Sequence, residues 1–206
     1  MTDAHRIETV EALEALYGEP MQLALDKEVD TIIPVYRAFI EKAPFVVVAT
    51  NGPEGLDCSP RGDPAGFVRV MDDKTVAIPD RRGNNRLDTL KNIVRDGRIA
   101  LLFLIPGAGE TMRINGTAEL SADPDLCASF AVKGKAPASV IVATVESIYV
   151  QCSKALVRSK LWDADAQIER SELPSMGEMI SALADSDFDS ESFEKTYPEQ
   201  VLKTLY

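Results

Sequence analysis

Histidine is almost missing from this chain, which has a single copy, His5, among 206 residues. That scarcity excludes Ser-His-Asp triads, histidine-rich metal sites and most histidine proton shuttles. The three cysteines, Cys58, Cys127 and Cys152, form no CxxC pair, so the sequence predicts neither a disulfide framework nor a zinc ribbon. If the protein catalyses a reaction, we expect a bound cofactor to supply the chemistry.

Basic residues are in the minority, with 22 Lys and Arg against 33 Asp and Glu, for a formal net charge of -11. Because affinity for phosphate backbones comes from clustered Lys and Arg, no nucleic acid partner is expected. The sequence has no apolar run long enough to span a membrane, and it has no apolar stretch near its start that could serve as the core of a signal peptide. We therefore expect a cytoplasmic protein with no membrane segment.

The composition that remains is typical of a folded protein, with 45% hydrophobic and 27% charged residues. A chain of this length can form one well-buried core with appendages. We expect a helical extension at residues 1–43, a main domain at 44–184, and a loosely attached acidic tail at 185–206.

Helical patterns occur at four places before the last predicted strand. Thr9 is expected to cap a helix that ends at Gly18, and Asp123 a helix near 123–132. Two longer patterns, at 32–42 and 84–95, show apolar residues at helical spacing. Their expected buried faces are Ile32, Val35, Phe39 and Ile40 in the first, and Leu87, Leu90, Ile93 and Val94 in the second.

Apolar runs of strand length dominate the chain after Pro44. Short turns such as MDDK and PGAGE join them, which favours an antiparallel sheet or barrel over a parallel βαβ array. Five or six strands are expected. The candidates are FVVVAT, LDCSP, and residues 67–70, 75–79, 98–105, 111–120 and 139–150.

The segment PDRRGNNRLDTLKN, residues 79–92, concentrates basic side chains within an acidic protein. It connects a predicted strand to a predicted helix, whose open N–H groups and positive dipole end attract anions. A helix capped by Asn84, with arginines paired to Asp80 and Asp88, fits the same pattern equally well. The polar side chains of this segment are Arg81, Arg82, Asn84, Asn85 and Arg86.

A second polar pair precedes this segment. Ser59 and Arg61 are two residues apart on a predicted strand, so their side chains point to the same side. They could face one ligand together. The alternative is that Arg61 forms an exposed ion pair with Asp63 or another acid and that Ser59 is a hydroxyl at a strand edge.

A third segment, CSKALVRSKLWD at 152–163, follows the last predicted strand. Lys154 and Arg158 are four residues apart and share one face of a helix, where they can contact an acidic group together. Trp162 can stack on a planar ring. The alternative is a solvated basic helix that Trp162 anchors in the core or at an interface.

With these segments in order, the chain resembles the pyridoxamine 5'-phosphate oxidase-like family of flavin-binding split barrels, and a bacterial branch of it in particular. The likeness covers roughly residues 30–180. It is carried by SPRGDPAGFVRV, IPDRRGNNRLDTLKNI, ALLFLIPGAGETMRINGTAEL and CSKALVRSKLWD. The resemblance implies a mainly β fold: a six-stranded antiparallel split barrel at 44–184 that forms a homodimer and holds FMN in clefts between the subunits.

The resemblance also implies which residues bind the cofactor. The family's phosphate-binding positions match Ser59, Arg61, Asn84, Asn85 and Arg86. Family oxidases often have Ser-Arg-Lys at the last three positions, so this chain lacks one positive charge there, which Arg81 or Arg82 could replace. The segment after the last strand commonly reaches the flavin ring from the partner subunit, which implies that role for Lys154, Arg158 and Trp162.

The expected function is that of an FMN-dependent oxidoreductase acting on an unknown small molecule, with no side chain singled out as catalytic acid or base. The arginine-rich end of true pyridoxamine phosphate oxidases has no counterpart here, so that reaction is not expected. Three alternatives remain open: a flavin- or haem-binding protein without turnover, a reductase using the deazaflavin F420, and a β-barrel interaction protein without cofactor.

Overall fold

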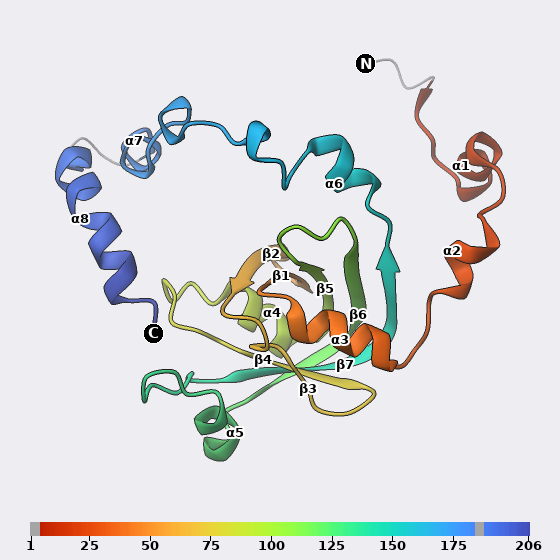
Figure 1. Ribbon diagram of the computed structural model, residues 1–206, viewed down its shortest axis with the longest axis horizontal. Coiled ribbons are helices and arrows are strands. Elements are labelled where there is room, and N and C mark those ends of the chain that lie inside the picture. Colours follow the sequence, from red (N-terminus) through yellow and green to blue (C-terminus); the bar gives the residue numbers. More distant parts are fainter. Residues whose placement is uncertain (1–4, 184–187) are drawn as a thin grey trace.

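A curved antiparallel sheet forms the centre of the computed structural model, which describes residues 5–183 and 188–206 (Figure 1). The strand order is β2-β1-β5-β6-β7-β4-β3, and every neighbouring pair is antiparallel, as predicted. The sheet has seven strands rather than six, because a two-residue strand, β3, pairs with β4 at one end of the order. The strands are β1 (Phe45–Gly52), β2 (Gly55–Gly62), β3 (Arg69–Val70), β4 (Thr75–Pro79), β5 (Arg98–Leu104), β6 (Thr111–Ser121) and β7 (Val140–Gln151).

The two faces of the sheet differ because side chains alternate along each strand. Val46 and Val48 of β1 are fully buried in the core, together with Leu101 and Phe103 of β5. The residues between them point to the outer face and are only half-buried. One face of the sheet therefore forms the main core, and the other is left partly open.

Helices lie against the sheet and at both ends of the chain (Figure 1). Two of the predicted N-caps are confirmed: Thr9 Oγ1 accepts from Ala12 N at 3.2 Å, and Asp123 accepts from Leu126 N at 2.7 Å. The helices are α1 (Val10–Tyr17), α2 (Gln22–Asp26), α3 (Pro34–Lys42), α4 (Asp88–Arg95), α5 (Pro124–Ser129), α6 (Lys154–Ser159), α7 (Met176–Ser181) and α8 (Ser190–Lys203), with short 3-10 turns at Ala164–Ala166 and Arg170–Glu172.

Helix α3 contributes to the main core through Tyr36 and Ile40, which are four residues apart on one face. The Tyr36 hydroxyl donates to the carbonyl of Lys27 at 2.6 Å and so ties the preceding segment to this helix. The prediction that Val35 is buried is wrong: it is 68% exposed, because the Tyr36–Ile40 face is the one that meets the sheet.

Helix α4 begins at Asp88, four residues later than predicted. Its buried residues are Thr89, Asn92 and Ile93. Leu87 and Val94 were predicted to be buried and are exposed, Val94 by 74%. The inward face of this helix therefore contains polar residues, which an apolar-periodicity argument does not detect.

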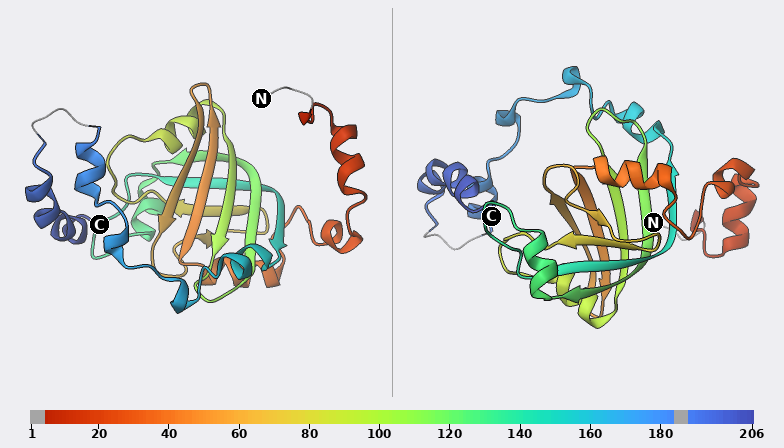
Figure 2. Two further views of the ribbon diagram at one scale, coloured as in Figure 1. Left: turned by 90° about the horizontal axis from the view of Figure 1, so that it is seen from above. Right: turned by 60° about the horizontal axis from the view of Figure 1, so that its bottom comes forward.

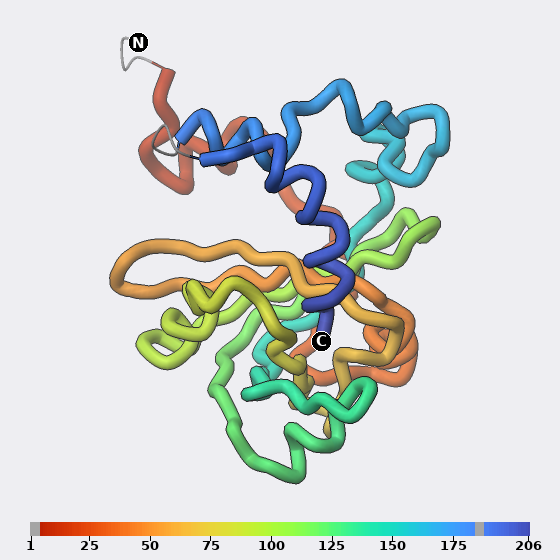
Figure 3. Tube along the Cα trace, turned by 90° about the vertical axis from the view of Figure 1, so that its left-hand side faces the viewer, coloured from red at the N-terminus to blue at the C-terminus, as the bar shows by residue number. Residues whose placement is uncertain are grey.

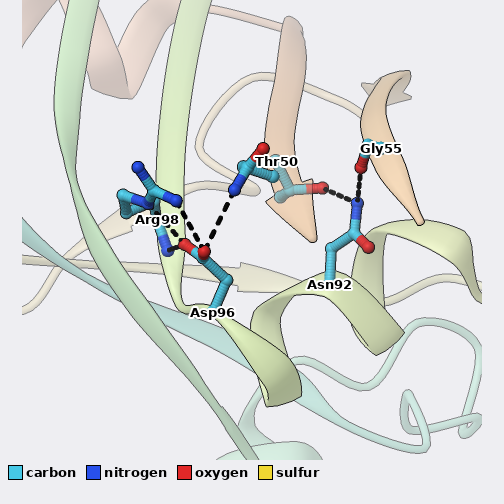
Figure 4. A network of polar contacts seen from close by, with 6 residues as sticks. Thr50, Gly55, Asn92, Asp96 and Arg98 are labelled. Carbon is cyan, nitrogen blue, oxygen red and sulfur yellow. Dashed lines mark hydrogen bonds and ion pairs between the residues drawn. The ribbon is translucent and has the colours of Figure 1, made fainter. Parts of the chain in front are cut away.

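The side chain of Asn92 holds α4 against the β1–β2 hairpin (Figure 4). Its amide nitrogen donates to Thr50 Oγ1 at 3.3 Å and to the carbonyl of Gly55 at 3.2 Å. A Cβ on Gly52 would clash with Asn92 Oδ1, so only glycine fits there while Asn92 keeps these hydrogen bonds. Just after the helix, Asp96 accepts two hydrogen bonds from the Arg98 side chain, at 2.6 and 2.7 Å, which hold the pKa of its carboxyl below the ordinary range.

Two arms leave the barrel on opposite sides (Figure 2). The first contains α1 and α2, neither of which buries a residue. The second contains α6, α7 and α8, so the segment predicted to be a loosely attached tail includes a 14-residue helix. Among the described residues, no helix has the length and apolar character needed to cross a membrane.

Candidate functional site

A pocket of about 1390 Å³ lies at the edge of the sheet, between β2, the loop before α4 and the first turn of α4. Its charged lining consists of five cationic and three acidic residues, although the whole chain is strongly acidic. Seven of the ten residues predicted from the sequence line this pocket. They are Ser59, Arg61, Arg81, Arg82, Asn84, Asn85 and Arg86.

Arg61 lies on the inner face of β2, opposite Val46 of β1. One terminal nitrogen donates to the carbonyl of Pro60 at 3.0 Å, and the other donates to Thr89 Oγ1 at 3.3 Å. Its Nε is buried and has no hydrogen-bond partner among the described residues. A buried guanidinium N–H without an acceptor is costly, and a small turn of the Arg61 side chain toward the pocket would let an anionic ligand accept from it.

Asp80 lies beside this arginine, with its Oδ1 at 3.7 Å from a terminal nitrogen of Arg61. Burial raises the pKa of the Asp80 carboxyl, and the positive charge of Arg61 only partly offsets that effect. At this separation the pair is an ion pair without a close hydrogen bond. Asp80 therefore neutralises part of the Arg61 charge but leaves donors of that side chain available.

Ser59 and Thr89 meet at a shared acceptor. Both hydroxyls donate to Asp57 Oδ2, Ser59 at 2.9 Å and Thr89 at 2.5 Å. This network links β2 to the first turn of α4. It confirms that Ser59 and Arg61 point to the same side of the strand, as their spacing predicted.

The two arginines that begin the loop have different surroundings. Arg81 is largely buried, and its Nε donates to Asp63 Oδ2 at 2.7 Å while a terminal nitrogen donates to the carbonyl of Phe130 at 2.8 Å. Arg82 is exposed and makes no hydrogen bond or ion pair within the described part of the chain. Arg82 is therefore available to a ligand, whereas Arg81 is engaged within the fold.

The rest of the loop leads directly into α4. Asn84 Oδ1 accepts from the backbone N–H of Arg86 at 3.1 Å, which closes a local turn, so the prediction that Asn84 caps the helix is wrong. The Arg86 side chain pairs with Asp88 at 2.9 Å and is 75% exposed, as the ion-pair alternative expected. Asn85 and Leu87 both have φ of 60°, in the left-handed region.

The N-cap of α4 is Leu87, whose side chain cannot accept a hydrogen bond. The backbone N–H groups of the first turn are thus left without a side-chain cap, and they open beside Arg61 and Thr89 in the pocket. A buried unpaired donor, an uncapped helix start and an exposed arginine form a donor set that fits a phosphate group.

The other three predicted residues lie outside this pocket. Lys154 and Arg158 are exposed on α6 and have no ion pair within residues 5–183 and 188–206. Trp162 is half-buried, and its indole N–H donates to the carbonyl of Ala108 at 2.7 Å, in the turn between β5 and β6. Within a single chain, these three residues therefore do not lie at the pocket that contains Arg61.

Sequence reasoning missed several residues of the pocket. Thr89 could have been found, because it is a polar residue in the first turn of a helix predicted to open an anion site. The loop before β7 and the end of α8 gave no such signal, since only the tertiary structure brings them near β2. The missed residues include Thr89, Lys135, Tyr197 and Tyr206.

Comparison with known proteins identifies the family to which this chain belongs. The model of the pyridoxamine 5'-phosphate oxidase family matches residues 32–152, which span all seven strands and α4. The chain belongs to this family, whose members commonly bind FMN or related flavins and include flavin-dependent oxidoreductases. No curated protein gives a significant match over the sequence.

Three solved structures are similar to part of this chain. HupZ of Group A Streptococcus is 24% identical over 59% of this chain and 95% of its own, with a TM-score of 0.50. A protein of Lactobacillus delbrueckii, described as a candidate pyridoxamine 5'-phosphate oxidase, is 20% identical over 59% and 95%, with a TM-score of 0.47. An FMN-binding protein of Syntrophomonas wolfei is 10% identical over 55% and 82%, with a TM-score of 0.42.

Proposed function

We propose that this protein binds FMN, with the flavin phosphate held by Arg61, Arg82 and the uncapped start of α4. The observation that carries the proposal is the Nε of Arg61, a buried donor with no acceptor among the described residues. A phosphate offers several strong acceptor oxygens and suits a guanidinium beside open backbone N–H groups. Family membership supports a flavin as the molecule that carries this phosphate.

The proposed activity is that of a flavin-dependent oxidoreductase acting on a small molecule. When bound, the flavin would supply the hydride and electron transfer. The chain would supply binding, orientation and positive charge: Arg61 and Arg82 at the phosphate, with Ser59 and Thr89 fixing the wall around it. No side chain is assigned as a catalytic acid or base. This agrees with the position of the single histidine, His5, which is exposed and lies before α1.

We also propose a homodimer formed through the outer face of the sheet. Three cross-strand pairs of β1 and β5 place apolar side chains on this face, and most of them are half-buried. A patch that is partly covered in one chain and continuous over two strands is typical of a surface that a second copy buries. The pairs are Phe45 with Leu104, Val47 with Leu102, and Ala49 with Ala100.

In this dimer, the helix α6 of one subunit would approach the flavin of the other. Two features support that part of the proposal: Lys154 and Arg158 are exposed cations, and α6 projects beyond the barrel (Figure 2). Trp162 would fix the end of this segment through its hydrogen bond to Ala108. Positive charge from the partner would stabilise a reduced, anionic flavin.

The test of the binding site is an FMN titration of the purified protein, followed by flavin fluorescence. The variant Arg61→Ala is expected to weaken binding roughly 10- to 100-fold, because one or two hydrogen bonds to a charged group contribute about 1.5–3 kcal/mol. Arg37→Ala is the matched control, since Arg37 is an exposed arginine paired with Glu41 on α3, away from the pocket. Equal affinities of Arg61→Ala and the unchanged protein would rule out the proposed phosphate site.

A further inference from the structure

The end of the chain lies against the pocket at β2. The pocket that contains Arg61 is also lined by two residues of α8, Tyr197 and Val201. It is lined as well by the three residues that follow this helix, Thr204, Leu205 and Tyr206. Figure 3 shows α8 descending toward the loop before α4 and ending beside it. This segment is separated from Arg61 by more than 130 residues of sequence, so only the fold brings the two together.

Tyr206 is held at the pocket rim by a buried carboxylate. The Asp63 side chain is only 3% exposed, and its two oxygens have separate donors. Oδ2 accepts from Arg81 Nε at 2.7 Å, and Oδ1 accepts from the Tyr206 hydroxyl at 2.6 Å. Asp63 therefore joins the last residue of the sequence to the loop that begins the proposed phosphate site.

A second contact fixes the backbone of the same residue. Lys135 Nζ donates to the main-chain oxygen of Tyr206 at 2.8 Å. The Tyr206 ring also lies near two cations, with Arg81 at 5.5 Å and Lys133 at 5.9 Å from its centroid, within the range of cation–π attraction. The bond to Asp63 raises the pKa of the Tyr206 hydroxyl and so keeps it protonated as a donor.

We propose that residues 197–206 form a wall of the flavin pocket and that Tyr206 latches this wall to Asp63 and Lys135, which slows the release of bound flavin. The inference rests on the proposed function for the identity of the ligand, but the latch itself does not. A flavin bound beside Arg61 would contact this wall, and two charge-assisted hydrogen bonds hold the wall in place, so loosening the wall would speed the release of the flavin.

The experiment compares the unchanged protein with Tyr206→Phe, which keeps the aromatic ring and removes the bond to Asp63. Tyr17→Phe is the control, because Tyr17 is 81% exposed on α1 and takes part in no contact at the pocket. The first measurement is hydrogen exchange of the α8 amides in the flavin-free protein. The second is the dissociation rate of FMN, followed by the recovery of free-flavin fluorescence when the FMN-loaded protein is diluted far below its dissociation constant.

The wall is supported if Tyr206→Phe speeds α8 exchange and raises the FMN dissociation rate, each roughly tenfold, while Tyr17→Phe changes neither. If Tyr206→Phe speeds α8 exchange but leaves the FMN dissociation rate unchanged, Tyr206 holds α8 in place but this segment does not slow flavin release. If α8 exchanges at the same rate in Tyr206→Phe and in the unchanged protein, Tyr206 does not hold α8 in place. Failure of the unchanged protein to bind FMN would instead reject the proposed function, and the exchange measurement would still decide on the latch.

Discussion

At the scale of single residues, the pocket depends on how Arg61 and Asp80 share a partly buried space. Burial penalises the charged form of Asp80, and the attraction of Arg61 at 3.7 Å offsets only part of that penalty. The raised pKa of Asp80 reflects this imbalance. An anion that binds Arg61 therefore competes with a carboxylate already beside it.

This competition predicts the effect of Asp80→Asn. The variant should bind FMN roughly three- to tenfold more tightly at pH values well above the raised pKa of Asp80, because removal of one partly screened negative charge at this distance is worth about 1 kcal/mol. A carboxyl whose folded pKa is raised carries its charge only above that pKa. The gain should therefore be full above the raised pKa and disappear as the pH falls through it.

The measurement is an FMN titration of both proteins across a pH series, with inorganic phosphate as a second ligand. Asp165→Asn serves as the control, since Asp165 is exposed in the second arm and lies outside the pocket lining. Weaker binding by Asp80→Asn would show that Asp80 orients Arg61 instead of competing with the ligand.

At the scale of elements, the position of α4 determines where the open N–H groups lie. The helix begins after a residue with left-handed φ, Leu87, and its inward face is anchored by a polar side chain, Asn92. Both features were hidden from pattern analysis, which expects apolar residues on the buried face and a polar cap at the start. The contacts with the β1–β2 hairpin override those local preferences.

The anchoring role of Asn92 can be tested by stability measurements. Asn92→Ala leaves the buried Thr50 hydroxyl without its Asn92 partner and the Gly55 carbonyl without its side-chain donor. The free energy of unfolding should fall by about 1–3 kcal/mol. Urea unfolding followed by circular dichroism measures this change.

Lys91→Ala provides a matched control in the same helix. Lys91 is exposed, and its replacement should change the free energy of unfolding by less than about 0.5 kcal/mol. If Asn92→Ala and Lys91→Ala were equally stable, the hydrogen bonds of Asn92 would not contribute to holding α4 against the β1–β2 hairpin.

At the scale of the whole molecule, the sheet has one face in the core and one face that a single chain leaves half-open. Two arms also extend from the barrel, and the first buries none of its own residues (Figure 2). Short helices without tertiary packing are marginally stable in water. This distribution of apolar surface agrees with the proposed homodimer.

The homodimer is tested by Leu102→Glu, which places a charge at the middle of the outer apolar patch. The unchanged protein should have a mass in solution of twice 22.5 kDa, and the variant should sediment as a single chain, because an unpaired charge at the core of an interface is strongly unfavourable. Val94→Glu, at an exposed position of α4, should leave the mass unchanged. A variant that stayed dimeric would move the proposed interface away from this face.

Much of the fold could be predicted from local pattern. The strands at 75–79, 98–105, 111–120 and 139–150 agree with the structure to within a residue or so, because long runs of β-branched and apolar residues between turns have no competing structure. The start of α4 was predicted four residues too early, and α8 was not predicted. Both depend on contacts made far away in the sequence.

Some features of the candidate site could likewise be predicted from the sequence, and others could not. The sequence by itself determined that a basic loop precedes a helix and that Ser59 and Arg61 share one side of a strand, since those properties follow from spacing and charge. Only the tertiary structure decided that Arg61 Nε is buried with no partner among the residues it describes, that Arg81 is engaged by Asp63, and that Tyr206 lines the same pocket. Burial and long-range pairing are properties of the packed chain, and no local pattern encodes them.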